Sequence, residues 1–404
     1  MRVPLASSGL RAIDIEAATR VLNSGQLTMG AEVKKFEAKM ASYLNVKHFV
    51  MVNSGSSANL LMIESLLRPT IAKPKLSYGD CILVPAIAWP TTVWPLIQLG
   101  LNPIFVDIDS ETLALDLTAA QRFIDSSRIP VSGIFPIHPL GHAISPGKLE
   151  EFVRKNDLVL INDVCESLGS WREDRHAGIV GQAASFSFYF SHHITTMEGG
   201  GIATNDDLMA DDLRSMRSHG WSRDRHDSAE WSAGVTKNDS KFLFVSTGYN
   251  VRPMEIQATI GSLQIDDLDD FVARRRLIAT EVSKAIEGTA LSLIGVETLL
   301  NPALTRTNSW MLLPLQVTGA NYSERKIKIV EDLEKAGIET RPVLTGNFLS
   351  QPAIQRITRN AVDPEHFSSA NYIAGSSFLV GAHHDLSYEQ IEFLCKTLRT
   401  TSMS

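Results

Sequence analysis

Short apolar runs alternate with helix-length segments through the first two-thirds of the chain. These runs predict seven strands, at 48–52, 81–84, 103–106, 133–136, 158–161, 184–189 and 201–204. Continuous apolar strands separated by helices are typical of an α/β fold, with a mainly parallel sheet covered by helices on both faces. Ligands of such sheets bind beyond the carboxyl ends of the strands, so the polar residues that follow the runs form the candidate site.

The pattern changes from about residue 285. A strand-like run at 310–317 is followed by an amphipathic segment, a second strand-like run from Ile338, and a final helix that starts with a capping-box sequence at 387–390. We therefore expect a large α/β domain over residues 1–284 and a smaller α+β domain over residues 285–404. A chain of 404 residues is too long for one ordinary core, which supports the division.

Composition narrows the class of protein. Hydrophobic residues make up 44% of the chain and charged residues 21%, as in ordinary globular proteins. The net charge is −7 and there is no basic block, which argues against nucleic acid as a partner. The three cysteines have unrelated spacings, so we expect a reducing, cytoplasmic environment and no metal site.

Two segments have an unusual composition, one of them without charged residues and the other strongly polar. The stretch between Asp80 and Asp107 has no charged residue, but it contains four prolines. Each proline removes a backbone donor, so two strands around a helix fit better than a membrane span. The polar segment at 217–241 is expected to be a loop at an active site or an interface.

Three features near strand ends suggest a ligand site, although each has an ordinary structural explanation. The small-residue turn 53–57 precedes a helix and can present N–H groups to an anion. Asp163 follows a strand directly, where it can face a ligand or cap the next helix. Trp89 can stack on a flat ring or fill a core. None of the three is decisive alone.

The segment from Ser185 to Gly201 carries a more specific pattern, in which Ser-Phe is followed by a loop and Glu-Gly-Gly. Together with the segments 24–37, 53–59, 161–170, 248–264 and 338–342, it resembles the sugar aminotransferases of the DegT/DnrJ/EryC1/StrS type. The resemblance covers most of the chain and implies the aspartate-aminotransferase-like fold of fold-type-I pyridoxal-phosphate enzymes. In that family a lysine before Glu-Gly-Gly binds the cofactor as a Schiff base. Here that position is His192, and no lysine occurs between residues 155 and 237.

The resemblance implies how the cofactor would be bound. Asp163 would pair with the pyridine nitrogen, and Trp89 would stack on the ring. Glu166 stands where the family usually has glutamine, and would reach the ring hydroxyl as a carboxylate. Four residues would surround the phosphate, one of them from a neighbouring subunit of a homodimer: Gly55, Ser56, Ser187 and the partner-facing Asn250.

Candidate substrate contacts lie on other segments. By the resemblance, Arg252 and Arg341 are candidates for binding a carboxylate or a sugar-nucleotide phosphate, since a planar guanidinium suits both. His138 and His142 follow a strand end, where each can contact a sugar or be a satisfied residue of the pocket wall. His193 is expected to be structural rather than catalytic.

A histidine in the lysine position changes the expected chemistry. Imidazole forms no stable imine, so pyridoxal or pyridoxamine 5′-phosphate would be held without a covalent bond. With a reference pKa of about 6.5, imidazole still moves protons. His192 and Glu166 together resemble a lysine-less 3-dehydratase branch of the family. That branch implies removal of the carbon-3 hydroxyl from a nucleotide-linked 4-keto-6-deoxyhexose, with GDP-4-keto-6-deoxy-D-mannose as the expected substrate, in the synthesis of 3,6-dideoxy sugars.

Glutamate is the expected source of the amine form of the cofactor, with ammonia released at the end. A related lysine-less group uses an iron–sulfur cluster, which needs four thiolates, and three scattered cysteines do not supply them. We therefore expect no such cluster. Two alternatives stay open, a sugar-nucleotide aminotransferase and a non-catalytic homologue that binds the cofactor or a sugar nucleotide. Other nucleotides, namely CDP, dTDP and UDP, also stay open.

Overall fold

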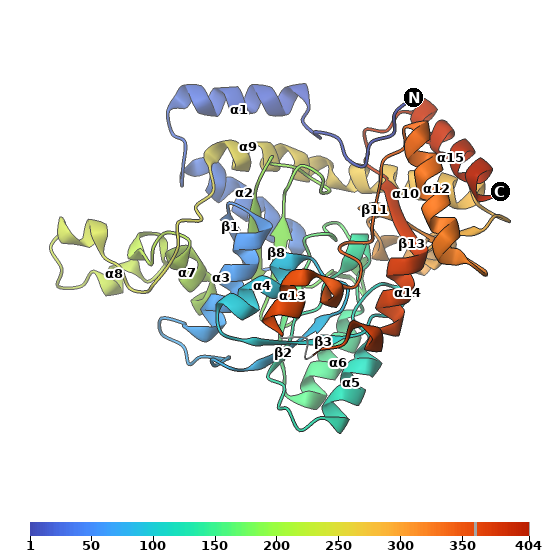
Figure 1. The fold of residues 1–404 in the computed structure, drawn as a ribbon. Coiled ribbons are helices and arrows are strands. Elements are labelled where there is room, and N and C mark those ends of the chain that lie inside the picture. Colours follow the sequence, from blue (N-terminus) through green and yellow to red (C-terminus); the bar gives the residue numbers. More distant parts are fainter. Residues whose placement is uncertain (359–361, 404) are drawn as a thin grey trace.

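The computed structural model describes residues 1–358 and 362–403, and its larger layer is a seven-stranded sheet (Figure 1). The strand order is β1-β9-β8-β5-β4-β2-β3. Strand β9 (Gly200–Thr204) is antiparallel to both of its neighbours, one of which is β1 (His48–Val52). The other five strands are parallel, and they are β8 (Ala183–Ser187), β5 (Val159–Asp163), β4 (Gly133–Ile134), β2 (Cys81–Pro85) and β3 (Asn102–Val106). The mainly parallel sheet predicted from the apolar runs is confirmed.

Two strands end earlier than the apolar pattern predicts. Strand β4 ends at Ile134, and Pro136 shortly after it has no N–H to continue a ladder. Strand β8 ends at Ser187, although the apolar run continues to Tyr189. Beyond Ser187 the backbone bonds locally, with the His192 N–H donating to the Tyr189 carbonyl at 2.9 Å. The end of this run therefore belongs to a loop at the sheet edge, where ligands bind.

Helices cover both faces of the sheet, and the alternation of side chains along β1 shows how. Val50 and Val52 pack on one face with α3 (Gly55–Leu67), α4 (Pro90–Gln98) and α7 (Asp207–Met216). Phe49 and Met51 point to the other face, where α2 (Ala31–Leu44), α9 (Glu255–Gln264) and part of α10 (Leu268–Ala285) pack. Helices α5 (Leu117–Ser126) and α6 (Pro146–Asn156) cover the far end of the sheet. Helix α1 (Ala12–Ser24) lies outermost, above α9 (Figure 1).

The C-terminal part forms a second, smaller sheet. Its antiparallel order is β10 (Leu291–Leu293), β11 (Leu312–Val317), β13 (Ser377–Gly381) and β12 (Thr340–Arg341). Helices α12 (Tyr322–Ala336), α14 (Ser368–Ser376) and α15 (Tyr388–Ser402) pack around this sheet. The predicted capping box at the start of α15 is confirmed, with reciprocal bonds between Ser387 and Gln390. Val3 and the end of α10 also join this core, and the domain boundary at residue 285 stays a prediction.

The uncharged stretch between Asp80 and Asp107 folds as β2, α4 and β3, as expected. Pro95 lies inside α4, and the helix is only nine residues long. Within residues 1–358 and 362–403, no helix combines the length and the apolar character needed to cross a membrane.

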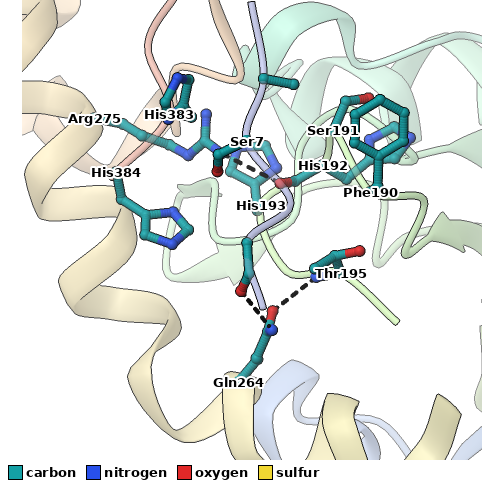
Figure 2. Close-up of a pocket in the computed structure, with 12 residues that line it drawn as sticks. Ser7, Phe190, Ser191, His192, His193, Thr195, Gln264, Arg275, His383 and His384 are labelled. Carbon is teal, nitrogen blue, oxygen red and sulfur yellow. Dashed lines mark hydrogen bonds between the residues drawn. The ribbon is translucent and has the colours of Figure 1, made fainter. Parts of the chain in front are cut away.

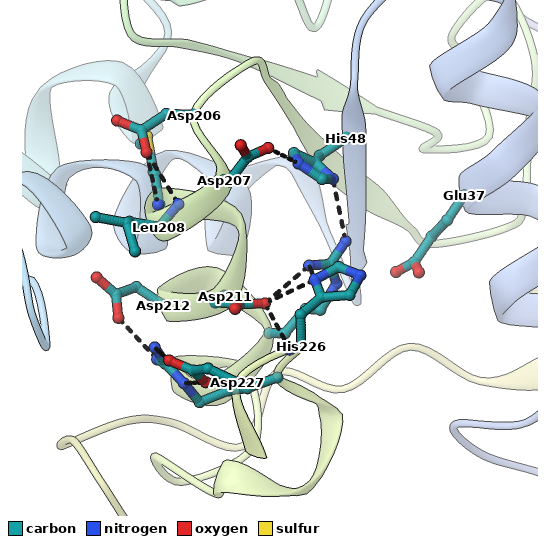
Figure 3. Close-up of polar contacts among 12 residues, drawn as sticks. Glu37, His48, Asp206, Asp207, Leu208, Asp211, Asp212, His226 and Asp227 are labelled. Atoms are coloured by element: carbon teal, nitrogen blue, oxygen red, sulfur yellow. Dashed lines mark hydrogen bonds and ion pairs between the residues drawn. The ribbon is translucent and has the colours of Figure 1, made fainter. Parts of the chain in front are cut away.

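The polar segment 217–241 extends away from the body of the protein and carries the short helix α8 (Ser228–Trp231) (Figure 1). Its base is fixed to α7 by buried charges (Figure 3). The Arg225 guanidinium is completely enclosed and lies 2.9 Å from Asp212 Oδ1 and 2.6 Å from Asp227 Oδ1. Beside it, His226 Nδ1 lies 3.1 Å from Asp211 Oδ1. The segment is thus an anchored projection, and its role at an active site or an interface stays a prediction.

Candidate active site

A cavity of about 380 Å³ lies beyond the carboxyl ends of the parallel strands. Residues from the strand ends form its floor, while Met311, Arg341 and Leu344 of the C-terminal part close one side. Eight of the eleven site residues predicted from the sequence line it, and they are Gly55, Ser56, Trp89, Asp163, Glu166, Ser187, His192 and Arg341. Gly55 and Arg341, which are 286 residues apart in the sequence, therefore meet in one pocket.

One end of the cavity is the turn between β1 and α3. Ser54 caps the helix, since its hydroxyl accepts the Ser57 N–H at 3.1 Å. Gly55 packs closely against β8, because a Cβ atom there would lie 2.6 Å from the Ser187 Cβ. The exposed Ser56 and the Ser187 hydroxyl flank this thirteen-residue helix at its N-terminus. Free N–H groups, two hydroxyls and the helix dipole make this end suitable for a phosphate.

Asp163 lies at the floor of the cavity, and its carboxylate is held by three donors. Thr92 Oγ1 and Asn59 Nδ2 donate to Oδ2 at 2.7 and 2.9 Å, and the Cys165 N–H donates to Oδ1 at 3.1 Å. The Asp163 side chain is only 4% exposed, so these bonds replace most of its hydration. Asp163 is the last residue of β5 and precedes a turn rather than a helix, so the helix-cap interpretation is wrong.

Glu166 and Arg341 form a charged pair on the cavity wall. Their closest side-chain atoms, Oε1 and Nη2, are 3.9 Å apart, and the other carboxylate oxygen accepts the Leu140 N–H at 2.9 Å. The backbone of Leu140, which donates this N–H, has a left-handed conformation with φ of 51°. Burial raises the pKa of Glu166, while Arg341 and the Leu140 N–H oppose the shift. A carboxyl in this setting can carry a proton more readily than an exposed one.

His192 follows β8 and lines the cavity from the loop side. Its imidazole is enclosed except where it borders the cavity, and Nδ1 has no hydrogen-bond partner among the described residues. Burial, together with the positive charges of the nearby Arg341 and Arg275, lowers the pKa of His192 to about 3. The ring is therefore neutral near pH 7, which leaves a nitrogen lone pair available to accept a proton.

His138 does not line this cavity, and its predicted role in substrate binding stays a prediction. The side chain is fully buried below the cavity floor, and it is not among the cavity-lining residues. Its Nε2 lies 3.2 Å from Asn162 Oδ1, and its Nδ1 accepts the Ile144 N–H at 3.2 Å. Both ring nitrogens are thus satisfied within the protein, which matches the alternative of a structural role. His193 is also buried, with Nε2 3.2 Å from the Ser309 carbonyl oxygen.

Asn250 and Arg252 do not reach the cavity of their own chain. Both lie at the base of the projection 217–241, where Ser218 forms a backbone bridge with Asn250. Arg252 Nη1 donates to Ser218 Oγ at 3.1 Å. Asn250 is exposed, so it is free to contact a second chain, and its role at a neighbouring site stays a prediction.

Comparison with known proteins decides the family. The sequence model of the DegT/DnrJ/EryC1/StrS aminotransferase family matches residues 10–399. The chain belongs to this family. It is 36% identical over 401 residues to a GDP-4-keto-6-deoxy-D-mannose 3-dehydratase of Yersinia pseudotuberculosis, a match that covers 98% of each chain. It is 35% identical to the enzyme of the same name from Escherichia coli O55:H7, with 98% of this chain and 99% of the relative covered.

Solved structures agree with this family assignment. An Escherichia coli GDP-4-keto-6-deoxy-D-mannose-3-dehydratase with bound hydrated PLP superposes with a TM-score of 0.88 at 33% identity, over 98% of this chain and 99% of that one. A variant of a 3-dehydratase with bound GDP-perosamine superposes with a TM-score of 0.87 at 34% identity, over 98% of this chain and all of the other. The aminotransferase-like fold expected from the resemblance is confirmed.

The lining of the cavity contains the histidine and lacks the lysine, as the sequence pattern indicates. None of the seventeen lining residues is a lysine, and His192 occupies the loop position after β8. Sequence reasoning missed Asn59 and Thr92, which fix the Asp163 carboxylate from two different helices. The available signal was the polar Asn59 directly before the apolar run 60–63 of α3. No sequence signal identified Thr92, since a threonine in the first turn of a helix is common.

Proposed function

We propose that the protein is a pyridoxal-phosphate-dependent lyase that removes the carbon-3 hydroxyl of GDP-4-keto-6-deoxy-D-mannose. The observation that carries this proposal is His192, a neutral base at the loop position where the family has its lysine. Full-length relatives named for this reaction support it. The net reaction consumes glutamate and the keto-sugar, and it yields 2-oxoglutarate, ammonia and the 3-deoxy keto-sugar.

The cavity fits pyridoxal or pyridoxamine 5′-phosphate held without a covalent bond. The Gly55 turn with Ser56 and Ser187 suits the phosphate, since it offers N–H groups, hydroxyls and a helix N-terminus. Asp163 presents a fixed carboxylate to a ring N–H. Trp89 is 49% exposed on the cavity wall, where its flat face is available to a ring. Relatives have been solved with PLP and with a PLP–glutamate adduct, which supports both the cofactor and the amino donor.

When bound, the cofactor supplies an amine for the sugar ketone and an aromatic ring that accepts electrons. The chain supplies the proton movements. His192 would accept a proton from the methylene carbon that joins the cofactor ring to its amine. It would then return a proton to the hydroxyl that leaves carbon 3 of the sugar. Glu166 holds or shares a proton at the ring hydroxyl, helped by its raised pKa. Because no lysine lines the cavity to reprotonate the sugar, elimination replaces amino transfer.

Substrate binding is assigned to the two arginines. Arg341 borders the cavity beside Glu166, where it can bind the carboxylate of glutamate or a phosphate of the sugar nucleotide. Arg252 serves the site of a second chain in a homodimer, together with Asn250. This assignment is supported by their position at the base of the projection 217–241, where Asn250 is exposed and Arg252 is half-buried. The product belongs to the synthesis of a 3,6-dideoxy sugar, and a more distant relative is named for lipopolysaccharide biosynthesis. The cytoplasmic location stays a prediction.

The test is incubation of the protein with pyridoxal phosphate, glutamate and GDP-4-keto-6-deoxy-D-mannose, followed by mass analysis of the sugar nucleotide and an ammonia assay. We expect a 3-deoxy keto-sugar together with an equal amount of ammonia. A 4-amino sugar without ammonia would contradict the proposal and favour the aminotransferase. Binding of cofactor and sugar without any turnover would instead identify a non-catalytic binding protein.

A further inference from the structure

A buried arginine lies behind His192, on the side away from the cofactor cavity. Arg275 of α10 is 1% exposed, and no carboxylate of the described residues lies within ion-pair distance of it. Its guanidinium bonds carbonyl oxygens instead, with Nη1 donating to Met311 at 2.9 Å and Nη2 donating to His192 at 3.2 Å. Burial lowers the pKa of Arg275 to about 10, which still leaves the group charged near pH 7.

The two carbonyl groups that Arg275 binds belong to two different segments of the active-site lining. His192 lies on the loop after β8, and Met311 lies just before β11 of the smaller sheet, and both line the cavity. One rigid, planar donor therefore connects the catalytic loop with the C-terminal wall from behind. A third carbonyl, that of Trp310, lies 3.5 Å from Nη1.

Arg275 faces a small pocket on this hidden side (Figure 2). Three more imidazoles surround it, from the catalytic loop and from the turn after β13, and they are His193, His383 and His384. Burial lowers the pKa of each, so all three are neutral near pH 7. The guanidinium is thus the positive charge of this pocket, and burying such a charge without a counter-ion is costly. Buried groups of this kind concentrate at functional sites.

We propose that Arg275 is a positioning residue for His192, which holds the catalytic loop against the Met311 wall through the two carbonyl bonds. The same charge disfavours a second positive charge on the neighbouring imidazole, and so it helps to keep His192 in its proton-accepting form. This inference rests on the proposed function only in taking His192 as the base.

The test compares Arg275→Met and Arg275→Lys with a matched control on the same helix, Arg274→Met. Arg274 also donates to a backbone carbonyl, that of Leu386 at 2.9 Å, but unlike Arg275 it does not line the small pocket behind His192. With GDP-4-keto-6-deoxy-D-mannose and glutamate, we expect Arg275→Met to lower kcat about 10-fold to 100-fold, since misplacement of a catalytic group is costly, with little change in KM. Arg275→Lys should recover part of kcat. The control should stay within about two-fold of wild type.

A second readout needs no cofactor. In the cofactor-free protein labelled at histidine, the His192 resonance is assigned by its absence in His192→Asn. We expect it to titrate about one pH unit higher in Arg275→Met than in wild type, and unchanged in Arg274→Met. None of the variants replaces another titratable or charged group near His192. These groups are Asp163, Glu166 and Arg341 on the cavity side and His193, His383, His384 and Asp385 behind.

The outcomes separate this inference from the proposed function. Unchanged kcat and unchanged His192 titration in Arg275→Met would overturn the inference. Parallel losses of activity and melting temperature in Arg275→Met and Arg274→Met would also overturn it. Where Arg275→Met does not fold, Arg275→Gln replaces it, and equal activity of the Lys and Gln variants would be the contradicting result. If wild type forms no 3-deoxy sugar, the rate of cofactor conversion by glutamate alone still reports on Arg275, because that step uses the same base.

Discussion

Removal of the Thr92 hydroxyl tests whether the hydrogen bonds that hold the Asp163 carboxylate contribute to cofactor binding. Thr92 is fully buried, and its hydroxyl donates to Asp163 Oδ2 at 2.7 Å. Thr92→Val keeps the shape of the side chain but removes this donor. A hydrogen bond to a charged group contributes about 1.5–3 kcal/mol. Asn59 still donates to the same oxygen, so we expect the lower end of that range. A loss of about 1.5 kcal/mol corresponds to roughly ten-fold weaker binding of the cofactor.

Equilibrium dialysis of pyridoxal phosphate against the purified protein measures this change directly. Thr92→Ser is the matched control, because it keeps the hydroxyl and loses only a methyl group. We expect its dissociation constant to stay within about two-fold of wild type. The reasoning is refuted if the valine variant binds the cofactor as tightly as wild type. It is also refuted if the serine variant loses as much affinity as the valine variant.

Three further changes have defined outcomes. His192→Asn should lower the dehydration rate about 10²–10⁴-fold, because a general base is lost, while dialysis shows unchanged cofactor binding; retained activity would place the base elsewhere. Ser187→Ala should weaken pyridoxal phosphate binding by about 1 kcal/mol but leave pyridoxal binding unaltered, and an equal loss for both ligands would contradict a phosphate contact. Burial lowers the pKa of His138 and His142 to about 4, below the value of about 6.5 in the unfolded chain. The unfolded state then binds more protons below pH 6.5, so each residue should reduce the free energy of unfolding by about 2 kcal/mol between pH 7.5 and pH 5. Urea denaturation at the two pH values measures this, and a stability that rises toward pH 5 would show the opposite sign.

Much of the fold was predictable because its strands are buried on both faces and separated by helices. Apolar runs such as 48–52 and 158–161 identified strands close to their observed bounds. The ends of the runs were less certain, since Phe188 and Tyr189 continue the apolar pattern after β8 has ended. Phe188 is buried in the core beside Phe36, whereas Tyr189 is exposed in the loop that carries His192. Hydrophobicity alone does not show where a strand ends and a loop begins.

The candidate site was predictable where residues follow strand ends directly. Asp163, Glu166, Ser187 and His192 all lie within a few residues of β5 or β8, and the topology brings them together. His138 shows the limit of this reasoning, because it also follows a strand end but turns into the core, where Asn162 and Ile144 satisfy its ring. The direction of a side chain at a strand end depends on its neighbours in space.

By itself the sequence determined that His192 replaces the lysine of its family. Residues 156–236 contain no lysine, so no small shift of the alignment could supply one. It also determined the order of strands and helices, which follows from local hydrophobic patterns. Only the tertiary structure decided which residues hold Asp163 and His192 in position. Thr92 and Asn59 reach Asp163 across 71 and 104 residues of chain, and Arg275 reaches the His192 carbonyl across 83 residues. Such bonds depend on how helices pack against the sheet, and no local pattern encodes that packing.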